Sequence, residues 1–126
     1  MTFTSHVVHG SQHGRTIGYP TVNLEVTDQV RQAFEKYGVY AVAATIAGQE
    51  YCGALFWGVR SLFVETDPVC EISLADFNGD AYGEEVAVEV IAYTRPAATV
   101  ADKDELKKLI KQDMHDAKKA YDLSRS

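Results

Sequence analysis

The sequence predicts a mainly β fold, in which a small antiparallel barrel or sandwich carries one C-terminal helix. Three observations support this class. Short stretches rich in valine, isoleucine and aromatic residues are separated by turn residues. The turns between them are too short for the helical crossovers that parallel strands need. A strongly amphipathic segment follows the last stretch and is long enough to lie across a sheet.

The strands are predicted from apolar or alternating runs of ordinary strand length. They cover residues 39–46, 51–57, 69–77 and 86–93. Residues 47–49 and 78–80 each contain the glycine expected of a tight connection, so neighbouring strands are expected to run antiparallel. Periodicity alone leaves a barrel and a sandwich both open.

Helical spacing occurs twice. A short helix is expected to place Val30, Ala33, Phe34 and Tyr37 on one face and to end at Gly38. A second, longer helix follows the strands and is described separately below. The sequence therefore predicts far more strand than helix before residue 100.

The second helix is predicted to begin after Asp102, which forms a capping box with Glu105. Its apolar stripe consists of Leu106, Leu109, Ile110, Met114, Ala117 and Tyr121. Its lysines are Lys107, Lys108, Lys111, Lys118 and Lys119. Because they are interleaved with Asp and Glu, we interpret them as a solvated face, not as a site for an acidic ligand. Residues 124–126 are expected to form a flexible tail.

The composition indicates a soluble globular protein of one domain, 1–126, with 46% hydrophobic and 24% charged residues. The net charge of −6 disfavours nucleic acid as a partner, because phosphate backbones are bound by clusters of lysine and arginine. No apolar run approaches the ~20 residues of a membrane span, and the N-terminus does not look like a signal peptide. We expect a cytoplasmic monomer without membrane partners, with Cys52 and Cys70 reduced and buried.

A glycine-rich segment covers residues 10–24. It contains Gly10, Gly14, Arg15, Gly18, Pro20, Thr21 and Asn23. Glycines let backbone N–H groups approach a phosphate closely, and an arginine can supply positive charge. The segment is neither a Walker A loop nor a dinucleotide fingerprint. By composition alone it is better explained as an ordinary glycine-rich turn, with Thr21 and Asn23 as turn formers after a proline.

The order of these residues is more specific, since Gly-Arg-Thr-Ile-Gly-Tyr-Pro-Thr-Val-Asn-Leu closely resembles the signature of the riboflavin kinase family. The resemblance continues in the family's order through Tyr37-Gly-Val-Tyr-Ala41, Cys70-Glu71-Ile72, Asp76-Phe77, Tyr82-Gly83, Arg95-Pro96 and a helix containing Asp113. It implies a six-stranded antiparallel Greek-key barrel with a C-terminal α-helix. It also implies phosphorylation of the riboflavin 5′-hydroxyl by ATP with Mg²⁺, or another divalent metal, to give FMN and ADP.

The resemblance also implies roles for individual residues. Thr21 and Asn23 would offer neutral oxygens to Mg²⁺, whose remaining ligands would be nucleotide phosphates. Glu71 would face a cavity and accept the proton of the 5′-hydroxyl. Without the resemblance, Glu71 would be interpreted as an exposed glutamate on a strand.

Further positions are implied for the two substrates. Those near ATP are Gly10, Gly14, Arg15, Gly18, Leu74, Asp76 and Tyr82, and the one beside the flavin is Arg95. Barrel packing is the alternative for Tyr82. His9 and His13 are interpreted as loop histidines, because the glycines around them oppose the helix that an i,i+4 metal site would need.

Two segments depart from the family's pattern. Phe56-Trp57-Gly58 stands where many relatives have Asn-Ile-Gly, and the proline expected in the following loop is missing. Ala97 and Val100 stand where an acidic residue and a phenylalanine are common. Flavin contact area is therefore lost unless Phe56, Trp57 or Phe63 compensates.

These departures support a non-catalytic flavin-binding or regulatory module as the alternative function. An oligonucleotide-binding barrel is a third possibility that the negative charge disfavours. Many bacterial relatives carry an adenylyltransferase domain that makes FAD before the kinase segment. This sequence begins directly at the kinase segment, so we expect FMN to be the final product here.

Overall fold

The computed structural model describes residues 1–9, 19–59 and 67–126. Its elements are β1 (Thr2–Val8), β2 (Thr21–Leu24), α1 (Asp28–Ala33), β3 (Gly38–Ile46), β4 (Gln49–Gly58), β5 (Val69–Leu74), β6 (Glu85–Pro96) and α2 (Lys103–Arg125). The six strands form a closed barrel in the order β1-β2-β5-β4-β3-β6, and every pair is antiparallel. Since β6 returns beside β3 after the β3-β4-β5 meander, the connection is a Greek key. The mainly β barrel with a C-terminal helix is thus confirmed, and a sandwich is excluded.

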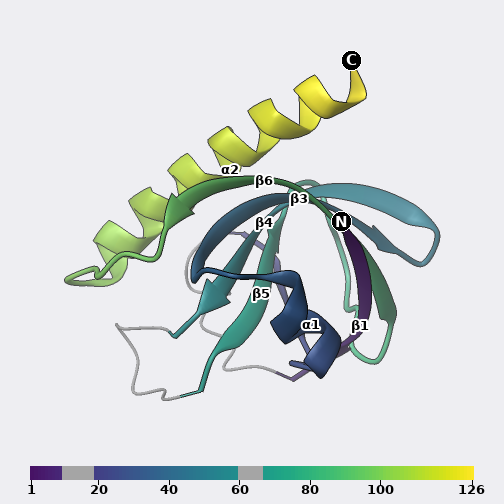
Figure 1. The fold of residues 1–126 in the computed structure, drawn as a ribbon. Coiled ribbons are helices and arrows are strands. Elements are labelled where there is room, and N and C mark those ends of the chain that lie inside the picture. The colour runs from purple at the N-terminus through teal and green to yellow at the C-terminus, as the bar shows by residue number, and fades with distance from the viewer. Residues whose placement is uncertain (10–18, 60–66) are drawn as a thin grey trace.

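Side chains that alternate along the strands fill the barrel interior. The largest fully buried ones include Leu55, Ile72, Leu74, Val42 and Val88. The buried side chain of Val30 from α1 packs into the same cluster, so α1, which lies beside β1, covers part of the barrel (Figure 1). A closed barrel leaves no free sheet edge, which removes a common route to aggregation.

Helix α2 runs across the outside of the barrel, over β3, β4 and β6 (Figure 1). Most of its predicted stripe is confirmed: Leu106, Ile110, Met114 and Ala117 are buried against small residues of β3 and β4, and Tyr121 packs beside them. Leu109 is half-buried and lies outside this cluster. The five lysines predicted to be solvated are all exposed. The predicted cap is confirmed at Asp102, whose carboxylate accepts a hydrogen bond from the backbone N–H of Glu105 at 2.8 Å. The second bond of the predicted capping box differs, because the Glu105 carboxylate accepts from the backbone N–H of Ala101, at 3.3 Å.

Helix α2 continues to Arg125, where we expected a flexible tail from residue 124. The Arg125 guanidinium donates to the carboxylates of Glu50, at 2.7 Å, and Glu89, at 3.0 Å. The Tyr121 hydroxyl also donates to Glu50, at 2.6 Å. These contacts attach the last turn of the helix to β4 and β6.

The first helix is shorter than predicted, since α1 ends at Ala33 and Phe34 has an extended backbone with φ −125°. Phe34 leaves the helix to pack in the barrel core, edge-on to Phe3 and against Tyr40. Gly38 is not a helix stop but the first residue of β3, where a Cβ would collide with the carbonyl oxygen of Arg95. Tertiary packing has overridden the local helical pattern.

We predicted that the third strand would end at Phe77, but β5 ends at Leu74. The reason is that Asp76 adopts a left-handed φ of 62°, which a strand does not accommodate. Patterns alone also missed β1 and β2. In β1 the inward position Ser5 is polar and interrupts the apolar alternation, although its hydroxyl is satisfied by the carbonyl oxygen of Glu25 at 2.7 Å. Strand β2 is only four residues long, which is too short for a periodic signal.

The β3-β4 hairpin turns on Ala47 and Gly48, whose φ values are 50° and 81°. Two positive φ values in a two-residue loop define a type I′ turn, in which Asn-Gly is preferred. We expect Ala47→Asn to raise the free energy of unfolding by about 0.5–1 kcal/mol, since alanine is strained in this region. Gly48→Ala is the opposing control and should lower it by about 1 kcal/mol, because no atom lies within 4 Å of the added Cβ and only backbone strain changes. Urea unfolding measures both, and equal stabilities would contradict the strain.

Candidate active site

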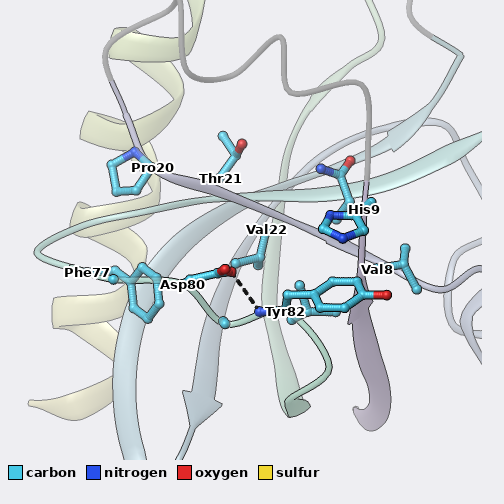
Figure 2. A pocket seen from close by; sticks show the side chains of 12 residues that line it. Val8, His9, Pro20, Thr21, Val22, Phe77, Asp80 and Tyr82 are labelled. Carbon is cyan, nitrogen blue, oxygen red and sulfur yellow. Dashed lines mark hydrogen bonds between the residues drawn. The ribbon is translucent and has the colours of Figure 1, made fainter.

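The predicted metal and base residues lie on the outer surface of the barrel. Along β2, Val22 and Leu24 point into the core, so Thr21 and Asn23 point outward. Along β5, Cys70, Ile72 and Leu74 fill the core, so Glu71 and Ser73 also point outward. Figure 2 shows Thr21 and Val22 on opposite sides of β2.

The register connects these residues into one row. Asn23 on β2 is the direct partner of Glu71 on β5, and Glu71 is also the partner of Phe56 on β4. Phe56 is in turn the partner of Val39 on β3, and Val39 is the partner of Arg95 on β6. We call this series the cross-strand row; it crosses β2, β5, β4, β3 and β6. Directly opposed side chains on neighbouring strands are within about 5.5 Å at their Cβ atoms. Glu71 is therefore an immediate neighbour of both Asn23 and Phe56, from which it lies 48 and 15 residues away in the chain.

Glu71 is a buried carboxylate, with only 5% of its surface exposed. The interpretation of an exposed strand glutamate is therefore wrong. A carboxylate is almost never buried to this degree unless it is paired or serves a function. Its surroundings are the outer face of the barrel and not the barrel interior.

Thr21 and Asn23 also line a pocket of about 230 Å³ between β1, β2 and the loop that follows β5. His9 and Tyr82 form one wall, with their rings stacked at 3.8 Å between centroids and 15° between planes. On the other side lie Phe77 and Asp80, whose carboxylate accepts a hydrogen bond from the Tyr82 backbone N–H at 2.9 Å (Figure 2). The pocket thus combines flat aromatic surface with the neutral side-chain oxygens of Thr21 and Asn23.

Arg95, at the far end of the cross-strand row, is paired with Asp113 of α2. Its Nε and Nη2 atoms donate to the two carboxylate oxygens at 2.7 and 2.8 Å, and Nη1 donates to the carbonyl oxygen of Pro96 at 2.9 Å. Asp113 is 4% exposed. Two parallel hydrogen bonds in this planar geometry join the helix to β6 and fix the guanidinium.

Comparison with known proteins decides the family. The flavokinase (riboflavin kinase) family model matches residues 1–121. The chain belongs to the riboflavin kinase family. The bifunctional riboflavin kinase/FMN adenylyltransferase of Bacillus subtilis is 33% identical over 114 residues, which are 88% of this chain and 35% of that protein.

Solved structures agree on the fold. A Streptococcus pneumoniae structure described as a macrolide-efflux protein has 33% identity and a TM-score of 0.79, covering 93% of this chain and 38% of that one. The riboflavin kinase from Trypanosoma brucei has 23% identity and a TM-score of 0.65, covering 94% of this chain and 77% of that one. The chain spans about a third of the length of the B. subtilis relative.

Not every site residue predicted for a flavokinase is brought together. Gly10, Gly14, Arg15 and Gly18 lie outside the described residues, as does Phe63. Tyr82 lines the pocket and is 55% exposed, so it is not barrel packing. Asp76 is exposed after β5, and Leu74 is fully buried in the core, where its side chain cannot reach a ligand.

Three further features were not predicted from the sequence. His9, interpreted as a loop histidine, lines the pocket and stacks on Tyr82. Asp80 lines the same pocket. Asp113 was recognised only as part of a family block, and its pairing with Arg95 depends on how α2 docks. The sequence did contain one signal for this pairing. Asp113 is a charged residue next to Met114, a member of the apolar stripe of the predicted helix.

The donor set of the outer face is compatible with magnesium. Among residues 1–9, 19–59 and 67–126, no group of three or more His, Cys, Asp and Glu side chains could hold a metal ion. Thr21 and Asn23 supply two neutral oxygens beside the pocket, which suits a cation that takes few protein ligands and completes its shell with phosphates and water. The residues present therefore fit a nucleotide-bound Mg²⁺ better than a metal bound by protein alone.

Neither helix in the described part of the chain has the length and apolar composition needed to cross a membrane. Cys52 and Cys70 are free and buried, as predicted. Burial raises the pKa of the Cys70 thiol to about 12, so it is not a nucleophile at neutral pH.

Proposed function

We propose that this chain is a riboflavin kinase that transfers the γ-phosphate of ATP to the 5′-hydroxyl of riboflavin, giving FMN and ADP. The observation that carries the proposal is the direct cross-strand pairing of Asn23 with Glu71. It supports the proposal because the amide oxygen of Asn23, a donor suited to Mg²⁺, would lie beside the buried carboxylate of Glu71, as phosphoryl transfer to an alcohol requires.

The nucleotide is assigned to the 230 Å³ pocket. The adenine ring has a flat surface available in the stacked pair of His9 and Tyr82. The phosphates would then extend along β2 toward Thr21 and Asn23. Bound there, Mg²⁺ would neutralise charge on the β- and γ-phosphates.

The acceptor alcohol is assigned to Glu71. Its carboxylate would accept the 5′-hydroxyl proton as the new O–P bond forms and the bond between the γ-phosphorus and the β,γ-bridging oxygen breaks, so that ADP leaves with that oxygen. Since Asn23 and Glu71 are neighbours, a γ-phosphate held at β2 would lie beside a hydroxyl held at β5. This arrangement acts mainly by positioning.

The proposal is tested by incubating the protein with riboflavin and MgATP and separating the flavins by chromatography. We expect FMN and ADP in equal amounts. Tight FMN binding without ATP consumption would instead identify the non-catalytic flavin-binding module. Failure to form FMN across pH values and divalent metals would overturn the kinase proposal.

The metal assignment predicts a specific mutational contrast. Thr21→Val keeps the side-chain shape but removes the hydroxyl oxygen, so the Mg²⁺ concentration needed for half-maximal rate should rise by at least about 10-fold. Thr21→Ser retains the oxygen and should stay within about twofold of the wild type in the same titration. If both variants need the same Mg²⁺ concentration, Thr21 does not contact the metal.

A further inference from the structure

Ser73 is a buried polar residue on the same outer face of the barrel as Glu71. It alternates with Ile72 and Leu74, whose side chains fill the core, so its own side chain points outward. Only 6% of the residue is exposed. Within the described part of the chain, the Ser73 hydroxyl forms no hydrogen bond with another residue. Since no fully enclosed side-chain oxygen of these residues lacks a partner, the Ser73 oxygen is open to a water or a ligand-dependent partner.

The hydrogen bonds between β2 and β5 show how closely Ser73 approaches Thr21. The two residues are directly opposed in the register. The backbone N–H of Leu74 donates to the carbonyl oxygen of Pro20, at 2.9 Å, so Pro20 and Leu74 form a hydrogen-bonded pair. Such pairs alternate with non-hydrogen-bonded pairs along an antiparallel ladder, which makes Thr21 and Ser73 a non-hydrogen-bonded pair. Their Cα atoms are therefore expected about 4.5 Å apart, and their side chains lie at the closest cross-strand approach.

The same alternation makes Asn23 and Glu71 the next non-hydrogen-bonded pair along the ladder. Four polar side chains thus share the outer face of two neighbouring strands. We call Thr21, Asn23, Glu71 and Ser73 the polar quartet. Two of its members are the proposed metal ligands and a third is the proposed base. Ser73 completes the group and has no role in the chemistry described so far.

The other neighbours of Ser73 leave its hydroxyl available to Thr21. On β4 it is opposed by Ala54, whose methyl group offers no hydrogen bond. Beside it lies a cavity of about 10 Å³, which Arg95 and Asp113 also line. This volume is at the limit for one water molecule, and three polar groups are enough to hold one. Because a hydroxyl is both a donor and an acceptor, Ser73 can donate toward the cavity while its oxygen accepts from Thr21.

We propose that Ser73 is a positioning residue for Thr21, whose hydroxyl donates a hydrogen bond to the Ser73 oxygen when Thr21 binds Mg²⁺. A hydroxyl that gives a lone pair to a cation keeps its proton, which needs an acceptor. Partners behind a metal ligand orient it and strengthen metal binding. The described residues show no hydrogen bond between these two hydroxyls, so the bond belongs to the metal-bound state. The inference rests on the proposed function, because it takes Thr21 as a ligand of nucleotide-bound Mg²⁺.

The experiment measures ATP binding by calorimetry at a series of Mg²⁺ concentrations, without riboflavin. Ser73→Ala should raise the Mg²⁺ concentration needed for half-maximal tightening of ATP binding by about 5-fold, as expected for one neutral hydrogen bond. ATP binding without Mg²⁺ should equal that of the wild type, because Ser73 does not line the nucleotide pocket. Ser73→Cys has a weak hydrogen-bonding group of similar size and should show a similar loss, so it decides the result if Ser73→Ala is poorly folded by circular dichroism.

Ser5→Ala is the matched control, because it removes a serine hydroxyl of similar burial outside the polar quartet. Ser5 is 4% exposed, points into the barrel and donates to the carbonyl oxygen of Glu25. The control should lose stability but keep the Mg²⁺ dependence of ATP binding within about twofold of the wild type. A change as large as that of Ser73→Ala would show that loss of any buried hydroxyl causes the effect and would overturn the inference.

A double variant distinguishes positioning from a general loss of structure. Since Ser73 is proposed to act through Thr21, Ser73→Ala should change the Mg²⁺ dependence by less than about twofold in a Thr21→Val background. An equal effect in both backgrounds, or no effect of Ser73→Ala in a folded protein, would overturn the inference. If Thr21→Val itself has no effect, the metal assignment and the inference are both wrong. Absence of FMN formation by a wild type that binds MgATP would contradict the kinase proposal alone, so the two failures are distinguishable.

Discussion

Glu71→Gln is expected to lower turnover by about 10²–10⁴-fold while nucleotide binding is retained. The amide has nearly the same shape as the carboxylate but cannot accept the proton of the 5′-hydroxyl. Glu71 is 5% exposed and lies directly opposite Asn23. No exposed carboxylate among the described residues has this position, so none is expected to replace Glu71 as the base. Single-turnover formation of FMN at saturating riboflavin and MgATP measures the effect.

Glu89→Gln is the control for this prediction, because Glu89 is a half-exposed carboxylate on β6, with 46% of its side chain exposed, and pairs with Arg125. It should leave turnover within about twofold, as expected for a surface substitution outside the site. ATP affinity, measured by calorimetry, should be similar in both variants. Turnover of Glu71→Gln equal to that of Glu89→Gln would remove Glu71 as the base.

Asp113→Ala is expected to lower the free energy of unfolding by about 3 kcal/mol, the lower end of the loss when one partner of a buried pair is removed. The variant leaves the Arg95 guanidinium without two of its hydrogen bonds beneath α2. We place the loss at the lower end because the Arg95 side chain is 21% exposed and regains some hydration. Urea unfolding followed by circular dichroism measures the change.

Asp122→Ala is the matched control on the same helix. Asp122 pairs with Lys118 at 3.1 Å on the surface, where both side chains are mostly exposed. A surface pair of this kind contributes about 0–1 kcal/mol, so the control should be almost as stable as the wild type. The double variant Arg95→Met/Asp113→Leu should be more stable than Asp113→Ala, because no charge is left unpaired. Equal losses in Asp113→Ala and Asp122→Ala would show that the Arg95–Asp113 pair does not hold the helix.

The sequence predicted the parts of the fold that depend on local patterns. The stripe of α2 and its Asp102 cap follow from side-chain spacing and from hydrogen bonding within one helical turn, and both are confirmed. The four strands predicted from apolar runs are present, with different ends. Local patterns failed where partners far along the chain decide the conformation. Phe34 left its helix for the core, and Ser5 was accepted inside β1 because Glu25 satisfies its hydroxyl.

By itself, the sequence determined that the chain forms antiparallel strands followed by a C-terminal helix, because periodicity is a property of the chain. The order of its motifs, through the resemblance to the riboflavin kinase family, made a barrel the expected form and made Thr21, Asn23 and Glu71 the candidates for the chemistry. Only the tertiary structure decided that Glu71 lies between Asn23 and Phe56, because strand register is fixed by which side chains the closed barrel buries. It also assigned the guanidinium of Arg95 to Asp113, since a pair between β6 and α2 exists only once the helix has docked.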